Sequence, residues 1–111
     1  MLLSIVFILK AALMSHFIVT FKIHEDNEFR RRYDSVTTRL KALARWANWD
    51  ETASFWAFEC SGCAASLCRD LRLFTELDVT KDVLVVIDLD QREKRSEGVL
   101  YPDLLNASLG F

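Results

Sequence analysis

The sequence predicts an α+β domain in which an antiparallel sheet carries two helices on one face. Residues 82–90 (DVLVVIDLD) contain five consecutive apolar residues bounded by acids, which is typical of a strand covered on both faces. Residues 17–23 (FIVTFKI) are the comparable earlier run. Two segments with helical spacing separate the strand-like segments, which gives the order β-α-β-β-α-β. This order is the ferredoxin-like pattern.

The first helix is predicted over residues 28–46. Apolar side chains recur there at intervals of four, three, four and three residues, which places them on one helical face. These side chains are Phe29, Tyr33, Val36, Leu40 and Leu43. The polar turn at residues 24–27 precedes this helix and offers Asp26 or Asn27 as its capping residue.

The second helix is predicted over residues 62–77, with Ser61 as its cap. Its apolar face consists of Ala64, Leu67, Cys68, Leu71 and Phe74. The predicted strands are residues 15–23, 46–52, 54–60 and 82–90, with a short C-terminal fifth strand at 98–101. Residues 91–97 (QREKRSE) are predicted to be a charged turn. The predicted organisation is an apolar N-terminal extension (1–13), a ferredoxin-like domain (14–101) and a C-terminal tail (102–111).

The fourth strand determines the expected assembly. The ferredoxin-like strand order, 4-1-3-2, places this strand at an edge of the sheet, although it is the most hydrophobic strand in the chain. An exposed hydrophobic edge promotes aggregation. We therefore expect a homodimer in which the partner's tail strand covers this edge. The expected interface residues are Val83, Val85, Ile87, Val99 and Tyr101.

Length, net charge and cysteine content limit the kinds of protein that this chain can be. A chain of 111 residues forms one domain, and a net charge of −2 excludes the overall basic field that is typical of nucleic-acid binders. Three cysteines do not indicate a secreted disulfide framework, so we expect a reducing, cytoplasmic setting. The apolar run in residues 1–13 is shorter than the roughly 20 residues that span a bilayer, and no membrane association is expected. That segment is a non-essential extension, an extra element packed on the core, or a targeting segment.

Residues 15–101 resemble the CRISPR-associated protein 2 family and its SinR-like relatives. The resemblance rests on the step Phe21-Lys22-Ile23 at the end of the first strand and on Arg31-Arg32-Tyr33 in the first helix. It also rests on residues 54–60 (SFWAFEC), which are similar to that family's Ser-Val-Phe-Glu-Cys. The resemblance implies a ferredoxin-like homodimer whose tail strand adds to the partner's sheet. Some members are metal-dependent nucleases, and others are structural dimers in spacer acquisition.

The residue at position 22, a lysine, favours one of these two roles over the other. It occupies the position at which the family has its metal-binding acid, and its ammonium group would repel a magnesium ion that needs oxygen ligands. We therefore predict a non-catalytic, homodimeric binding or scaffold module without a cofactor. The alternative is a metal-dependent endonuclease, acting on RNA or DNA, in which Glu25 or Asp26 binds a divalent ion such as Mg²⁺. The other interpretation of these two acids is a role in the turn and the helix cap.

The first helix concentrates positive charge. Residues 28–46 contain six basic and two acidic side chains, which gives 6 − 2 = +4 in an acidic chain. Such a cluster can bind nucleic-acid phosphates without reading sequence, and the alternative is a solvated helix face that lies off the apolar face. The candidate phosphate-binding residues are Arg30, Arg31, Arg32, Arg39 and Arg45.

Cys60 and Cys63 form a C-x-x-C motif between a strand and a helix. Backbone N–H groups at a helix N-terminus stabilise thiolates, so a thiol-redox or metal-handling protein is a second alternative. A zinc site needs four ligands, and no second pair of Cys or His residues completes one. In the other interpretation Cys60 is an ordinary strand residue and Cys63 has no special role.

Overall fold

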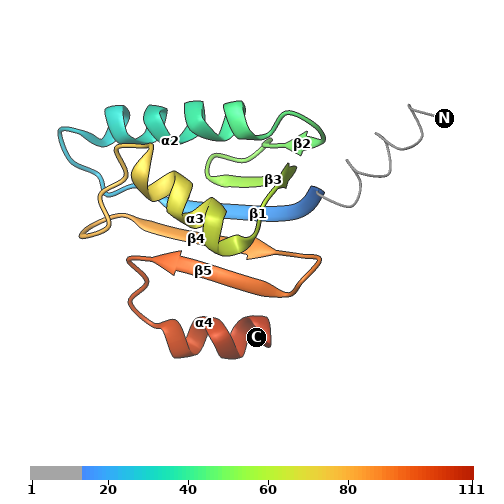
Figure 1. Ribbon diagram of the computed structural model, residues 1–111. Coiled ribbons are helices and arrows are strands. Elements are labelled where there is room, and N and C mark those ends of the chain that lie inside the picture. The colour runs from blue at the N-terminus through green and yellow to red at the C-terminus, as the bar shows by residue number, and fades with distance from the viewer. Residues whose placement is uncertain (1–13) are drawn as a thin grey trace.

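The computed structural model describes residues 14–111 as an α+β fold (Figure 1). Its elements are β1 (Met14–Lys22), α2 (Phe29–Leu43), β2 (Asn48–Trp49), β3 (Phe55–Ser61), α3 (Ala64–Leu73), β4 (Val83–Asp88), β5 (Glu93–Glu97) and α4 (Pro102–Leu109). The extension predicted for residues 1–13 lies outside the described residues. Within residues 14–111, no helix has the length and hydrophobicity that a bilayer span requires.

The strands form one antiparallel sheet in the order β2-β3-β1-β4-β5. The first four strands follow the predicted ferredoxin-like order, and β5 extends the sheet beyond β4. The predicted α+β class is therefore confirmed. The two helices end earlier than predicted, at Leu43 and Leu73 and not at residues 46 and 77, and β2 (Asn48–Trp49) is shorter than the predicted strand at 46–52.

The core lies between the sheet and the two longer helices. Along β1, Phe17, Val19 and Phe21 are buried and alternate with partly or fully exposed residues. Such alternation buries one face of a strand. The helices α2 and α3 cover this face (Figure 1), and residues from both join one apolar cluster. The helical members are Val36, Leu40, Ala64, Leu67, Cys68 and Leu71, and Ala44 joins them from the C-cap of α2.

The edge of the sheet differs from the prediction. β4 is not an edge strand, because the chain's own β5 pairs with it from Leu84↔Glu97 to Asp88↔Glu93. The expected cover by a partner's tail strand is therefore wrong for β4. The fifth strand exists, but it lies in the segment predicted to be a charged turn and not at residues 98–101. Charged side chains suit it because it is an edge strand that faces water.

The turn before β5 explains this shift. Asp88 accepts hydrogen bonds through Oδ1 from the backbone N–H groups of Asp90 (3.0 Å) and Gln91 (3.1 Å). Arg92 has a φ of 52°, which completes the chain reversal. An aspartate side chain that caps the following backbone favours such a turn. The reversal therefore comes directly after Asp88 and leaves residues 93–97 free to pair.

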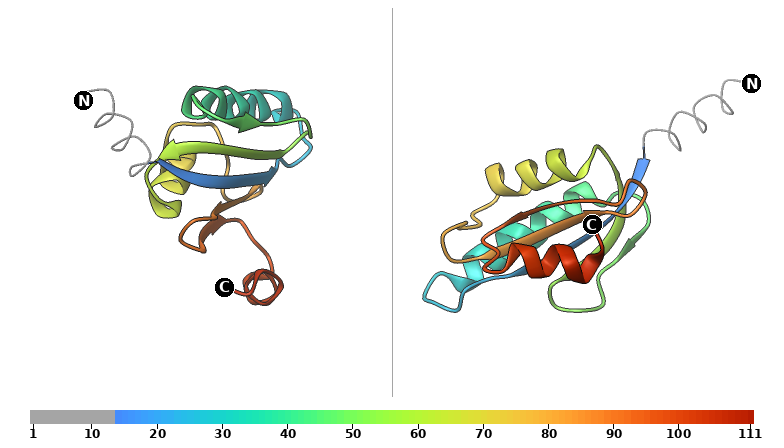
Figure 2. Two further views of the ribbon diagram at one scale, coloured as in Figure 1. Left: turned by 90° about the vertical axis from the view of Figure 1, so that its right-hand side faces the viewer. Right: turned by 90° about the horizontal axis from the view of Figure 1, so that it is seen from below.

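The C-terminal tail forms a further helix that the sequence analysis did not predict. In α4 no residue is buried, and Leu104 is 64% exposed. The helix lies on the opposite side of the sheet from α2, below β5 (Figure 2). Lys94 Nζ donates a hydrogen bond to the carbonyl oxygen of Phe111 and lies 5.2 Å from the centre of its ring. These contacts attach the tail to β5.

Candidate functional site

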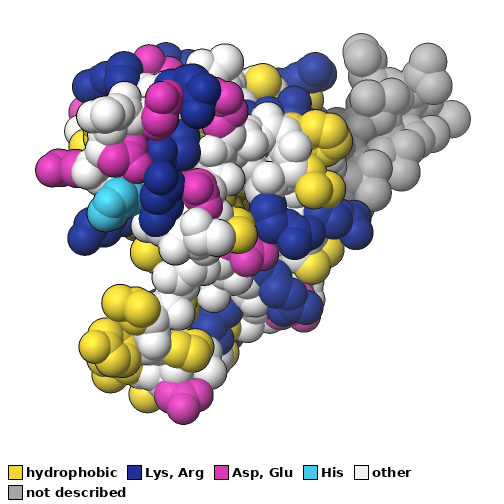
Figure 3. Space-filling view, turned by 90° about the vertical axis from the view of Figure 1, so that its left-hand side faces the viewer, with side chains coloured by type: hydrophobic (Ala, Val, Ile, Leu, Met, Phe, Trp, Pro, Cys, Tyr) yellow, Lys and Arg dark blue, Asp and Glu magenta, His cyan; other side chains and the backbone are white. Residues whose placement is uncertain are grey.

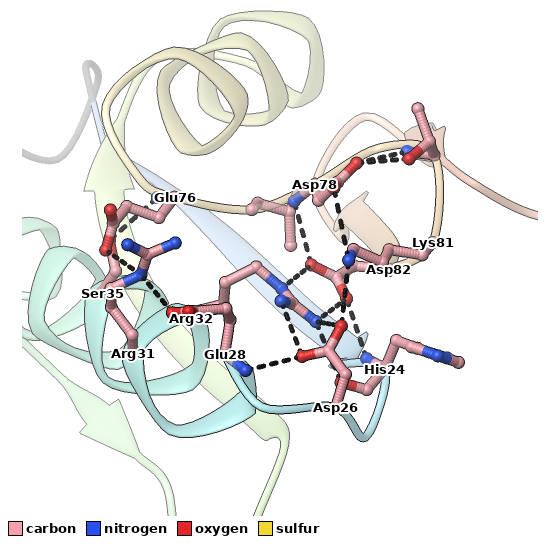
Figure 4. A network of polar contacts seen from close by, with 12 residues as sticks. His24, Asp26, Glu28, Arg31, Arg32, Ser35, Glu76, Asp78, Lys81 and Asp82 are labelled. Atoms are coloured by element: carbon pink, nitrogen blue, oxygen red, sulfur yellow. Dashed lines mark hydrogen bonds and ion pairs between the residues drawn. The ribbon is translucent and has the colours of Figure 1, made fainter.

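A buried ion-pair network lies at the end of β1, where the nuclease interpretation places its site (Figure 4). Arg32 is 3% exposed. Its Nε donates to Asp82 Oδ2 at 2.9 Å, and its Nη1 donates to Asp26 Oδ1 at 3.0 Å. Its Nη2 donates to the carbonyl oxygen of His24 at 2.9 Å. The guanidinium group thus ties α2 to the loop after β1.

Asp82 is the centre of the network. It is 1% exposed and accepts the backbone N–H of His24 at 2.8 Å and that of Asp78 at 2.9 Å, in addition to Arg32. One carboxylate therefore joins the loop after β1, helix α2 and the loop before β4. Buried charges of this kind are tolerated because each has a partner. The arrangement fixes the fold at this end of the sheet.

Asp26 belongs to the same network, which removes it as a free metal ligand. Oδ1 accepts from Arg32 and from the backbone N–H of Glu28, and Oδ2 lies 2.9 Å from Lys81 Nζ. The hydrogen bonds from Arg32 and then Lys81 hold the pKa of Asp26 well below its usual range. The two cations compensate its charge, so Asp26 has a structural role in the turn before α2, where it accepts the backbone N–H of Glu28. The prediction of Asp26 or Asn27 as the helix cap is wrong, because the N-cap of α2 is Glu28.

Glu25, the other acid considered as a metal ligand, lies at the surface beside Lys22. Lys22 and Glu25 line a hollow of about 690 Å³ at the end of β1, together with Phe29 and Tyr33. Both charged side chains are exposed. Among residues 14–111 no group of three or more His, Cys, Asp or Glu side chains has an arrangement that holds a metal ion.

The arginines predicted to bind phosphate differ in exposure, because one of them is buried and the others reach the surface. Arg32 is buried, so its assignment to a solvent-facing phosphate site is wrong. Position 32 lies three residues after Phe29 and four before Val36, and this helical spacing places it beside the apolar face.

Three of the other candidate arginines, Arg30, Arg31 and Arg39, have acidic partners on or beside α2 and α3. Arg30 pairs with Asp34 at 3.6 Å, and Arg31 with Glu28 at 3.1 Å and Glu76 at 3.6 Å. Arg39 makes a two-pronged contact with Asp70, at 2.8 and 2.7 Å. Arg45 is exposed and has no ion pair within residues 14–111. The positive charge of α2 is therefore largely compensated in three dimensions.

The two thiols of the C-x-x-C motif have different environments. Burial raises the pKa of Cys60 to about 11, whereas hydrogen bonds from Ser66 lower the pKa of the exposed Cys63 thiol. Cys63, and not Ser61, is the N-cap of α3, since its Sγ accepts the backbone N–H of Ser66 at 3.4 Å. Both thiols are free. This local capping role accounts for Cys63 without a redox partner.

His16 forms a surface cluster on the side of the sheet away from α2. Its Nδ1 lies 3.0 Å from Asp90 Oδ2, and its Nε2 lies 3.5 Å from Glu59 Oε1. The hydrogen bond to Asp90 raises the pKa of His16, and the same contact lowers the pKa of Asp90. The cluster lies beside a small hollow of about 320 Å³ that Trp49 and Leu89 also line.

This cluster gives a pH-dependent contribution to stability. A raised His16 pKa stabilises the fold below the unfolded value near 6.5, and the contribution disappears as the pH rises through the folded value. A lowered Asp90 pKa stabilises above the unfolded value near 3.9 and is lost as the pH falls. The His16→Gln variant should therefore melt a few degrees below the wild type at about pH 5.5 and close to it at about pH 9. Thermal melts followed by circular dichroism test this, with His24→Gln as control. An equal loss at both pH values would contradict it.

Comparison of the sequence with models of known protein families and with curated proteins, and of the structure with solved structures, found no significant match.

Proposed function

We propose that the protein is a non-catalytic, homodimeric binding or scaffold module, similar in role to the structural dimers of the CRISPR-associated protein 2 family. The observation that carries this proposal is an apolar patch on the sheet face turned away from α2 and α3, beside the His16 cluster on the same face. Across neighbouring strands, Ile18 pairs with Ala57 and with Ile87, and Ala57 pairs with Trp49. Antiparallel sheets normally present polar residues on a face that meets water.

This outer sheet face (Trp49, Ala57, Ile18, Ile87) contains part of the interface predicted from the sequence. Val83, Val85 and Ile87 alternate with the buried Leu84 and Val86, so they share this face. They were expected on an edge strand, but β4 is paired on both sides, so they lie on a face of the sheet. Val83 and Ile87 are partly exposed there. Val85 is already buried within one copy, at 8% exposure, so a second copy that covers the face would bury Val83 and Ile87 further.

Helix α4 supports the same proposal. An isolated helix of eight residues is not stable in water, because helices below about 12–15 residues gain too few hydrogen bonds to offset nucleation. Leu104, Tyr101 and Leu100 are 64%, 70% and 83% exposed on and beside it. Figure 2 shows α4 on the same side as the outer sheet face. In a two-fold dimer each copy supplies α4 and the face at once, as an isologous interface requires.

The non-catalytic part of the proposal rests on the residues near Lys22. Lys22 occupies the position of the acid expected from the resemblance, and Asp26 is engaged by Arg32 and Lys81. Neither side chain is available to hold a cation, because one is itself positive and the other is already paired.

Light scattering coupled to gel filtration tests the dimer. The wild type should have twice the chain mass of 12.8 kDa at micromolar concentration. The Leu104→Glu variant should weaken the dimer by more than about 100-fold, because each of two symmetric sites loses about 1.5–3 kcal/mol of apolar burial.

The matched control is Leu73→Glu. Leu73 is 60% exposed, close to the 64% of Leu104, but it lies at the end of α3 on the other side of the sheet. This variant should remain dimeric. A monomeric wild type, or the same loss of mass in both variants, would contradict the proposed interface.

A further inference from the structure

A second basic surface lies between α3 and β5, away from the helix in which the sequence concentrates its arginines. A groove of about 230 Å³ is lined there by Arg69, Arg72 and Arg95, with Cys68 and Ala65 beside them. Arg95 pairs with the buried Val86 in the sheet, so its side chain lies on the face that α3 covers. The two arginines of α3 are three residues apart and therefore neighbours on the helix surface.

In the described part of the chain, two of the three arginines of this α3–β5 groove, Arg69 and Arg95, lack the acidic partners that compensate α2, whereas Arg72 pairs with Glu97. Within residues 14–111, Arg69 has no ion pair, and Arg95 Nη1 donates only to the adjacent carbonyl oxygen of Lys94. Glu97 is the one acid among the described residues that line the groove, and its Oε1 lies 3.8 Å from Arg72 Nε. Three arginines and one glutamate give 3 − 1 = +2 in a chain of net charge −2.

Basic side chains gather at two places on this side of the molecule. In Figure 3, basic and acidic side chains are interspersed in the upper left, over the α2 end of the molecule. A further group of basic side chains, with acidic side chains beside it, lies to the right of the centre of the view. Guanidinium groups that converge on a groove, two of them without an acidic partner among residues 14–111, are an arrangement that binds phosphate, because each presents paired N–H donors to two phosphate oxygens.

We propose that the α3–β5 groove binds consecutive backbone phosphates of a nucleic acid without reading its sequence. This deepens the binding role proposed above and moves the phosphate contact from α2 to the groove. Cβ atoms three residues apart on a helix are about 5–6 Å apart, so Arg69 and Arg72 reach neighbouring phosphates of one strand. Arg95 approaches from the opposite wall. The groove lies on the side of the sheet away from the outer sheet face, so binding and dimerisation use separate surfaces.

Fluorescence anisotropy with a labelled single strand of about 20 nucleotides tests the groove at salt concentrations from about 50 to 200 mM. The Arg69→Gln/Arg95→Gln double variant should lose at least about tenfold in affinity at low salt. Each lost phosphate contact reduces the slope of log K against log salt by about 0.7, so the double variant should lose about 1.4. The control, Arg30→Gln/Arg31→Gln, removes the same charge from α2 and should change affinity less than about twofold, because those arginines are already paired.

The outcomes separate this proposal from the dimer. Equal losses in the two double variants, or an unchanged affinity in the groove variant, would overturn the groove. A wild-type dimer that does not bind the strand would also overturn it and leave the scaffold proposal standing. The groove variant should keep the wild-type mass and melting temperature. Inorganic tripolyphosphate is the second arm: weak displacement at equal phosphate concentration supports a nucleic-acid backbone, and full displacement assigns the groove to free polyphosphate instead.

Discussion

The Asp82→Ala variant should lose about 3–5 kcal/mol of folding free energy, which is the cost of breaking a buried ion pair and leaving its partner unpaired. Arg32 would keep Asp26 but would lose its contacts to Asp82 at 2.9 and 3.3 Å. The backbone N–H groups of His24 and Asp78 would also lose their acceptor in a part-buried site. Domains of this size have a total stability of only about 5–15 kcal/mol.

Urea unfolding followed by tryptophan fluorescence measures this loss, and a fall in melting temperature of at least about 12 °C should accompany it. The control is Asp34→Ala, which removes an exposed partner of Arg30 and should cost less than about 0.5 kcal/mol. A second comparison, Arg32→Met/Asp82→Leu, removes both charges but should recover only part of the stability, because the two backbone N–H groups stay without an acceptor. Wild-type stability in Asp82→Ala would show that the network does not hold the fold together.

The sequence identifies most of this fold because each strand has its own signal. β1, β3 and β4 are rich in β-branched and aromatic residues and alternate or run apolar, so their location follows from composition alone. The fifth strand has no such signal. Its residues, EKRSE, are charged, and their pairing depends on the turn that Asp88 closes. The hint in the sequence was an aspartate at the end of a strand, which favours a chain reversal.

The candidate sites could be predicted less well, because charge along a chain does not report charge in space. The net charge of +4 counted over residues 28–46 omits Asp70 and Glu76, which are far away in sequence and pair with Arg39 and Arg31. Conversely, Arg69 and Arg95 are 26 residues apart, and only the packing of α3 against β5 makes them one group. Counting charges along the sequence therefore overestimates the positive charge of α2 and misses that of the α3–β5 groove.

Gly98 should tolerate no side chain, and Gly98→Ala is expected to be among the most damaging single changes in the chain. The residue follows β5 with a φ of 71°, a conformation that costs a residue with a Cβ about 1–2 kcal/mol. A Cβ there would lie 2.0 Å from the carbonyl oxygen of Asp82. That oxygen belongs to backbone held in place by the Arg32 network, so it has little freedom to move aside.

The steric clash should therefore add to the conformational cost and bring the loss to about 3 kcal/mol or more. Gly110→Ala separates the two contributions. Gly110 has a similar φ of 84°, but the nearest atom to its added Cβ is Arg92 Nη2 at 3.6 Å, which is ordinary contact. That variant should lose only about 1 kcal/mol. Denaturant unfolding of both variants gives the difference directly, and equal losses would show that the approach of Gly98 to Asp82 relaxes at no cost. A larger loss at Gly98 would show that the end of β5 is fixed against the loop that carries Asp82, which links the edge strand to the network at the end of β1.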